Sequence, residues 1–83
     1  MNLVRDILNE IKWREGYDLS KVEIWYIHRG APNDTRIIRG DEIKSICKTF
    51  IETADAMIPH HRIFKIVYNG KNLFDRRDMK YKQ

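Results

Sequence analysis

The chain has 83 residues, of which 34% are charged and 42% are hydrophobic, and its formal net charge is +4. A chain of this length forms one small domain that buries only about 60% of its unfolded surface, which excludes a deep substrate cavity. The composition is too apolar for a disordered segment. We therefore expect a single folded domain over residues 1–83, with any site in a surface groove or a shared interface.

The positive charge lies in the C-terminal part of the chain. Residues 60–83 carry seven basic and two acidic side chains, a net charge of +5, whereas residues 1–59 carry nine basic and ten acidic side chains, a net charge of −1. The most basic segment is a tail at 76–83. This asymmetry favours a polyanionic partner such as nucleic acid, and a solvated basic tail is the alternative.

Cys47 is the single cysteine, so an intramolecular disulfide is impossible and a reducing, cytoplasmic location is expected. It lies within an apolar run and is predicted to be a core residue. No apolar run approaches the roughly 20 residues of a membrane span, and no signal peptide is recognisable. We expect a soluble cytoplasmic protein that does not contact membranes.

Residues 2–14 have the pattern of an amphipathic helix. The apolar side chains recur at helical spacing, and Gly16 is a plausible end signal. The stripe is formed by Leu3, Val4, Ile7, Leu8 and Ile11. This face is predicted to pack on a sheet.

Residues 22–28 have the strongest strand pattern, because β-branched and aromatic residues dominate. Large apolar side chains fall on both faces, so we expect a central strand with at least partial cover on both sides. The turn formers at 30–34 end it.

Four further strands are predicted, at 35–39, 45–52, 62–68 and 71–75, with a turn at 53–56 and a tight hairpin at Asn69-Gly70. No segment is long enough to supply crossover helices for parallel pairing. The fold class is α+β, with the N-terminal helix packed on one antiparallel sheet of about four or five strands.

The three histidines lie beside arginines at strand ends. His28-Arg29 follows the central strand, and His60-His61-Arg62 precedes a later one. If these strands are antiparallel neighbours, the two clusters meet at one edge of the sheet. Arginine matches phosphate oxygens and imidazole donates to them, so this edge is a candidate phosphate site.

Aromatic residues near the clusters offer base stacking as a further function. Trp25, Tyr26 and Tyr68 can stack a base if they are exposed, and they are core residues otherwise. Two histidines can also act as general acid and base on a phosphodiester. The His-x-Thr/Ser motif of two-histidine phosphoesterases is absent, however, so the sequence does not specify catalysis. Neither a metal nor a cofactor is predicted, because the histidine and cysteine spacings match no common zinc pattern.

The motifs together resemble a known family. Residues 25–32 read Trp-Tyr-Ile-His-Arg-Gly-Ala-Pro, residues 58–63 read Ile-Pro-His-His-Arg-Ile, and Tyr-Asn-Gly follows at 68–70. Over nearly the whole chain, this pattern is similar to a small, largely archaeal family of uncharacterised proteins described as an RNA cyclic-group end recognition domain.

The resemblance implies a binding module for RNA ends that carry a 2′,3′-cyclic phosphate, found alone or fused to RNA-processing and repair domains. It points to His28, Arg29, His61 and Arg62 as site residues. The family often has tyrosine where this chain has His60, which favours His61, whereas strand parity favours His60 because it would share a face with Arg62. Parity does not apply if the strand begins only at Ile63.

Two further departures concern the turn and the last strand. Asn33 replaces a common glycine, and Phe74 replaces a common tryptophan in a pattern that keeps Arg76, which is expected to join the phosphate-facing group. His60, Tyr26, Tyr68 and Arg76 are therefore peripheral candidates. Three hypotheses stay open: a module that binds phosphate-bearing RNA ends, a cyclic phosphodiesterase or ribonuclease, and a protein-interaction or dimerisation module.

Overall fold

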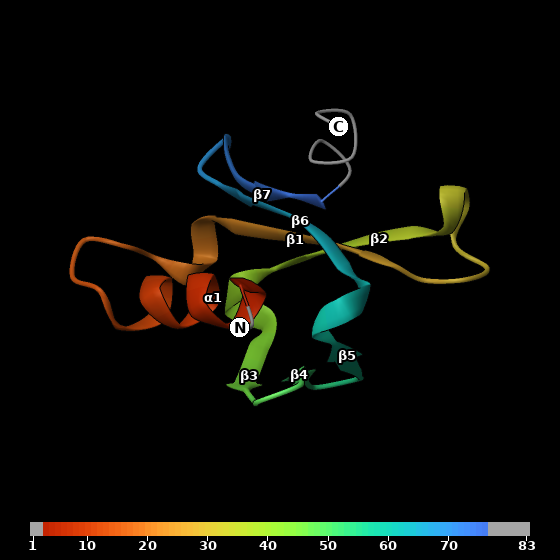
Figure 1. The fold of residues 1–83 in the computed structure, drawn as a ribbon, viewed down its shortest axis with the longest axis horizontal. Helices are drawn as coiled ribbons and strands as arrows, with labels where there is room; N and C mark the ends of the chain where they lie inside the picture. The colour runs from red at the N-terminus through yellow and green to blue at the C-terminus, as the bar shows by residue number, and fades with distance from the viewer. Residues whose placement is uncertain (1–2, 77–83) are drawn as a thin grey trace.

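The computed structural model describes residues 3–76, so residue 2 of the predicted helix and residues 77–83 of the predicted basic tail lie outside it. The described chain contains one α-helix and seven strands in two antiparallel sheets (Figure 1). The large sheet has the order β2-β1-β6-β7 and the small sheet the order β3-β4-β5. The elements are α1 (Leu3–Trp13), β1 (Val22–Ile27), β2 (Thr35–Arg39), β3 (Ile43–Ile46), β4 (Phe50–Thr53), β5 (Met57–Pro59), β6 (Ile63–Tyr68) and β7 (Lys71–Asp75).

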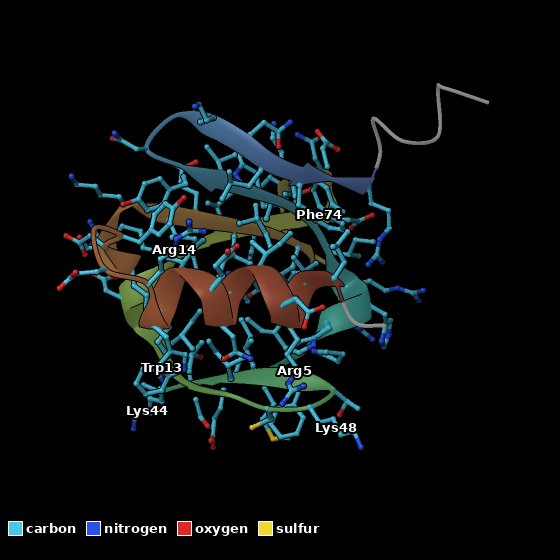
Figure 2. All side chains as sticks on the ribbon, turned by 60° about the vertical axis from the view of Figure 1, so that its left-hand side comes forward. Arg5, Trp13, Arg14, Lys44, Lys48 and Phe74 are labelled. Atoms are coloured by element: carbon cyan, nitrogen blue, oxygen red, sulfur yellow. The ribbon has the colours of Figure 1, made fainter. Side chains whose placement is uncertain are left out.

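Helix α1 lies between the two sheets, with the large sheet on one side and β3 and β4 on the other (Figures 1 and 2). Its apolar stripe buries Val4, Leu8 and Ile11, as the helical spacing predicted. The same core takes in residues of both sheets, among them Val22, Ile24, Ile66 and Phe74 of the large sheet and Ile51 and Ile58 of the small one. The α+β class is therefore confirmed, and one core serves both sheets.

The prediction of a single sheet is wrong, and so is the single strand at 45–52. That segment is a hairpin in which Ile46 pairs with Ile51 and the Cys47 amide donates to the Phe50 carbonyl at 2.8 Å. The connecting residues Lys48 and Thr49 are not typical turn formers, so the sequence carries no turn signal there. The short β5, which pairs with β4, was not predicted either.

Strand β1 is central in the large sheet, as predicted, with β2 and β6 as its neighbours. Its burial alternates: Val22, Ile24 and Tyr26 are buried towards α1, whereas Trp25 is half-buried and Ile27 is exposed on the opposite face. The face away from α1, here called the outer face, is therefore only partly covered.

Two predicted turns have the expected backbone. Asn33 has φ 58°, which shows that asparagine keeps the left-handed conformation in the loop after β1. In the β6–β7 hairpin Asn69 and Gly70 have φ 49° and 83°, the positive values that a two-residue hairpin turn requires.

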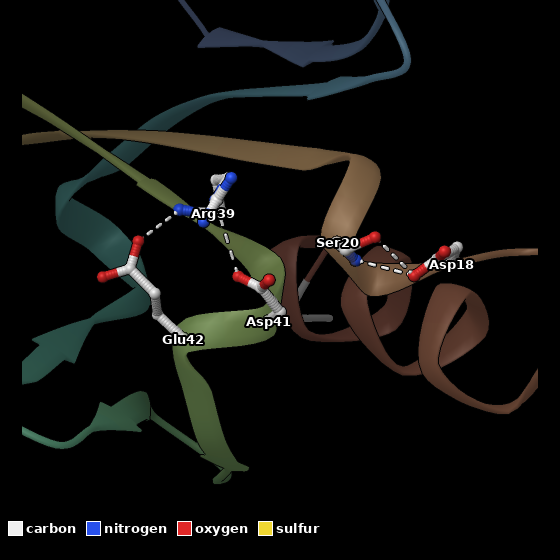
Figure 3. A network of polar contacts seen from close by, with 5 residues as sticks. All are labelled: Asp18, Ser20, Arg39, Asp41 and Glu42. Carbon is white, nitrogen blue, oxygen red and sulfur yellow. Dashed lines mark hydrogen bonds and ion pairs between the residues drawn. The ribbon is translucent and has the colours of Figure 1, made fainter.

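Two short 3-10 turns lie at the end of the large sheet that is farthest from His28: Leu19–Lys21 leads into β1, and Gly40–Glu42 follows β2 (Figure 3). The Asp18 carboxylate accepts hydrogen bonds from the Ser20 amide (2.9 Å) and hydroxyl (2.8 Å), and these bonds lower the pKa of Asp18. In the second turn, the Arg39 amide donates to Glu42 at 2.9 Å. The two turns thereby fix the end of the large sheet that is remote from His28.

Candidate functional site

The loop after β1 fixes the first histidine. The His28 amide donates to the Asp34 carbonyl at 2.8 Å, and the Ala31 amide donates to the His28 carbonyl at 3.2 Å. Gly30, with φ 96°, donates its amide to the Asp34 carboxylate at 3.4 Å. The His28 ring is exposed and packs edge-on against Tyr26 at 6.2 Å between ring centroids. The His28 imidazole is therefore exposed, while hydrogen bonds restrain the backbone of the loop that carries it.

The second cluster forms a 3-10 turn at His60–Arg62, and β6 begins only at Ile63. Strand parity consequently does not apply to the two histidines. Pro59 enters the turn with φ −60°. Within the turn His60 is buried, while His61 and Arg62 are exposed.

A groove of about 360 Å³ lies where the two sheets meet, and we call it the inter-sheet groove. One histidine and two arginines line it: His28, Arg36 and Arg62. The remaining walls come from Tyr26, Ile27, Ala56, Met57, Ile58 and Pro59. None of the described residues that line this groove is acidic, so its charge complements an anion.

Arg36 was not a candidate in the sequence. It pairs with Tyr26 across β1 and β2, which puts it on the same face of the sheet and close to the end of β1. Because β2 is an edge strand, its side chain is exposed there and not covered by the helix. The predicted strands at 22–28 and 35–39 place Arg36 beside the same loop as His28, but the sequence does not tell which face of the sheet Arg36 occupies.

A second hollow, of about 410 Å³, lies along the loop between β1 and β2, next to the inter-sheet groove. We call it the loop recess. It is lined by His28, Arg29, Gly30, Ala31, Pro32, Thr35 and Arg36. The predicted pair His28-Arg29 therefore flanks this recess, and His28 and Arg36 are shared with the inter-sheet groove.

His60 is only 4% exposed, and it connects the 3-10 turn to the small sheet. Its amide donates to the Thr49 carbonyl at 2.9 Å. Burial lowers the pKa of His60 below its usual 6.5, a hydrogen bond with the Phe50 backbone opposes that shift, and the charge of Arg5 adds to it. The lowered pKa favours a neutral ring, which supports a packing role.

The chain was compared with known proteins. A family model described as the MJ1316 RNA cyclic group end recognition domain matches residues 1–76. The chain belongs to this family.

Relatives of the MJ1316-domain chain are archaeal. It is 34% identical to a UPF0248 protein of Methanococcus maripaludis strain C6 over 77 residues, covering 90% of this chain and 100% of the relative. It is 41% identical to a UPF0248 protein of Archaeoglobus fulgidus over 71 residues, covering 84% of this chain and 99% of the relative. No solved structure gives a significant match.

In this MJ1316 domain, the structure brings together only some of the predicted site residues. His28 and Arg62 line one groove, Arg29 lines the adjoining recess, and Tyr26 forms a buried wall. The exposed His61 does not line either hollow, and the buried ring of His60 does not either. The roles of these residues in binding stay predictions.

Tyr68 and Arg76 lie apart from the inter-sheet groove. Tyr68 pairs with Val22 at the far end of β1, where its hydroxyl accepts a 2.9 Å hydrogen bond from the Asp18 amide. The Arg76 guanidinium instead donates to the backbone carbonyl of His61. The Tyr68 contact therefore supports the end of the large sheet remote from His28, and the Arg76 contact supports the turn beside the inter-sheet groove.

Two further observations concern residues 3–76. No group of three histidine, cysteine or acidic side chains in this part of the chain is arranged to hold a metal ion. Its one α-helix is also too short and too polar to cross a membrane.

Proposed function

We propose that this protein binds the phosphate-bearing end of an RNA strand, with a 2′,3′-cyclic phosphate as the preferred end, in the inter-sheet groove. The observation that carries the proposal is that His28 and Arg62, which are more than thirty residues apart in sequence, line one groove with Arg36 and without any acidic neighbour among the described lining residues. The family description, RNA cyclic group end recognition, supports the same ligand.

The chemistry of the groove suits a small anion attached to a sugar. The guanidinium groups of Arg36 and Arg62 can donate paired hydrogen bonds to phosphate oxygens, and His28 can donate another. The apolar walls at Ile27, Met57 and Pro59 can pack against a ribose, so the phosphate and its sugar have separate contacts.

Binding is favoured over hydrolysis by the position of the histidines. A two-histidine mechanism needs an acid and a base that both reach the phosphate. Among the described residues that line the groove, His28 is the single histidine. The described lining of the groove therefore supplies charge and hydrogen bonds that can hold a phosphate, but it contains one imidazole where the two-histidine mechanism needs two.

The test measures affinity for short RNAs that end in 2′,3′-cyclic phosphate, 3′-phosphate or hydroxyl, each at two salt concentrations. The cyclic end is expected to bind best, and equal affinity for all three would contradict end recognition. Nonspecific binding to the backbone would fall steeply with salt without regard to the end.

Variants localise the site. Arg62→Ala and His28→Gln should weaken binding of the cyclic-phosphate RNA by about tenfold or more, the usual cost of losing a charge-assisted hydrogen bond. Arg39→Ala is the matched control, since Arg39 is exposed near the other end of β2 and does not line the groove. It should weaken all three RNAs equally. Analysis of the RNA ends after incubation separates binding from turnover.

A further inference from the structure

The outer face of the large sheet carries a groove of about 580 Å³, which we call the outer groove. Its lining differs from that of the inter-sheet groove because it includes two aromatic rings, those of Trp25 and Phe64. The full lining is Trp25, Pro32, Asn33, Thr35, Ile37, Phe64, Lys65 and Asp75. A groove of this kind has room for a planar ligand.

The second ring, that of Phe64, lies at a bulge and is only 6% exposed. Trp25 pairs with Lys65, but the next residue of β1, Tyr26, pairs with Ile63, so Phe64 is the extra residue of β6. Phe64 consequently lines the outer groove beside Lys65, while Ile63 is buried in the core. Bulges re-aim side chains in this way and are common beside functional sites.

Trp25 is positioned to stack a base. Its indole nitrogen donates to the Glu23 carboxylate at 3.3 Å, which restrains the plane of the ring. The Lys65 ammonium lies 4.7 Å from the ring centroid. A lysine on an aromatic face is attracted weakly and is flexible, so a stacked base can displace it.

The charges of the outer groove suit a base better than a phosphate. Asp75 pairs with Lys65 across β6 and β7, and its carboxylate is part of the lining. A carboxylate repels phosphate but accepts hydrogen bonds from the N–H groups of a base edge. By this criterion the outer groove differs from the inter-sheet groove, whose described lining has no acidic residue.

The loop recess adjoins both grooves. That recess shares His28 and Arg36 with the inter-sheet groove and shares Pro32 and Thr35 with the outer groove. A strand held by its end at Arg36 can therefore pass the rim at Pro32 and reach Trp25 on the other face.

We propose that the outer groove takes an unpaired nucleobase of the same RNA strand, stacked on Trp25, upstream of the end held in the inter-sheet groove. This inference rests on the proposed function, since the end phosphate sets the register of the strand. The protein would then bind single-stranded RNA ends in preference to duplex ends, because a base in a duplex is stacked and paired and cannot stack on Trp25.

The test uses tetranucleotides that end in 2′,3′-cyclic phosphate, either intact or with one abasic residue at each upstream position in turn. Loss of the stacked base should weaken binding by about fivefold or more at one position. Trp25→Leu should weaken binding of the intact RNA to the same extent and make the abasic position irrelevant. Trp25→Phe keeps an aromatic ring and should retain most of the affinity, and Trp13→Leu, on α1, is the matched control.

A spectroscopic readout avoids dependence on the stability of Trp25→Leu. Trp13 and Trp25 are the two tryptophans, so in a Trp13→Phe protein the fluorescence comes from Trp25 alone. Intact RNA should quench it, and the RNA that lacks the stacked base should not.

The outcomes separate this inference from the proposed function. If cyclic and hydroxyl ends bind equally to the unmodified protein, the proposed function fails. If the end preference persists while no abasic position matters and Trp25 is not quenched, the inference fails alone. If Trp25→Leu instead abolishes self-association and leaves RNA affinity unchanged, the outer groove is a contact between copies, and the inference is again overturned.

Discussion

The Arg76 guanidinium, at the end of β7, donates a 2.9 Å hydrogen bond to the backbone carbonyl oxygen of His61 in the 3-10 turn before β6. The same guanidinium lies 5.5 Å from the ring centroid of Phe74, which is buried in the core. Arg76 thus links the end of the large sheet to the turn that presents Arg62 to the inter-sheet groove. It holds the backbone of the candidate site.

Removal of this link should loosen the turn. We expect Arg76→Ala to lower the free energy of unfolding by about 1 kcal/mol, the usual net contribution of one hydrogen bond, and to speed amide exchange at residues 61–63. The measurements are denaturant unfolding and hydrogen exchange followed by NMR. Lys71→Ala, at an exposed position near the other end of β7, is the control. Equal exchange rates in the two variants would show that the link does not hold the turn.

Arg36 gives a second prediction, because it lines both the inter-sheet groove and the loop recess. Arg36→Ala should lower the affinity for cyclic-phosphate RNA by about tenfold, as expected for loss of a charged hydrogen-bond donor. Arg36→Lys keeps the charge but loses the planar fork, so it should recover only part of the affinity. Unchanged binding by Arg36→Ala in a direct titration would remove this residue from the site.

His60 makes the stability of the fold depend on pH. Its pKa is lowered in the folded protein, chiefly by burial, so the unfolded chain binds the proton more readily. Above the pKa of the unfolded chain, about 6.5, the contribution of neutral His60 to stability is complete. As the pH falls below that value and through the lower pKa of the folded state, this contribution is lost. The free energy of unfolding should decline between pH 7.5 and 5.5.

The His60 contribution can be isolated by comparing neighbouring substitutions. His60→Gln should be less stable than the unmodified protein at pH 7.5, and its free energy of unfolding should change much less between pH 7.5 and 5.5. His61→Gln, at the adjacent exposed position, should keep it. A decline that is identical in both variants would assign the pH dependence to other groups.

The sequence anticipated the large sheet well, because its signals are local. The alternation in β1 and the Asn69-Gly70 turn fixed strand positions that the structure reproduces. The small sheet was missed because Lys48-Thr49 lacks turn chemistry, so two short strands read as one. Its residues Ile51 and Ile58 belong to the same buried core as the helix. The small sheet lies on the side of the helix opposite the large sheet, an arrangement that no local pattern encodes (Figure 2).

The candidate site was anticipated in part. The sequence predicted that His28 and Arg62 lie close together if their strands are antiparallel neighbours. In the structure β1 and β6 pair antiparallel, and both residues line one groove. The burial of His60 could not be predicted from the alternation of side chains along a strand, because His60 lies in a 3-10 turn and not in a strand. Arg36 was missed because the face of a short edge strand is set by its pairing register, which the sequence alone leaves open.

Gly40 is expected to be intolerant of any side chain. A Cβ atom there would lie 2.5 Å from the Leu19 carbonyl oxygen and 2.9 Å from the Val22 Cβ, both in the segment that leads into β1. Gly40→Ala should therefore lower the free energy of unfolding by about 1–3 kcal/mol through overpacking. Gly70 differs, because a side chain there would have open space but would be held at φ 83°, a backbone conformation that only glycine adopts without strain. Gly70→Asn should cost less than Gly40→Asn, because asparagine tolerates positive φ better than most side chains and would meet no atom there, and Gly40→Asn should be worse than Gly40→Ala in denaturant unfolding.

The shared core predicts that the two sheets unfold together. Ile51 of β4 is fully buried in the cluster that includes α1 and the large sheet, so Ile51→Ala should cost about 2–5 kcal/mol for the whole domain. Ile37, which is 49% exposed on the outer face, is the matched isoleucine, and Ile37→Ala should cost about 0.5 kcal/mol or less. With both variants made in the Trp13→Phe protein, far-ultraviolet circular dichroism and the fluorescence of Trp25 in the large sheet should give coincident transitions for each. A separate early transition in Ile51→Ala, without loss of the Trp25 signal, would mean that the small sheet is an independent unit and that the inter-sheet groove can open without global unfolding.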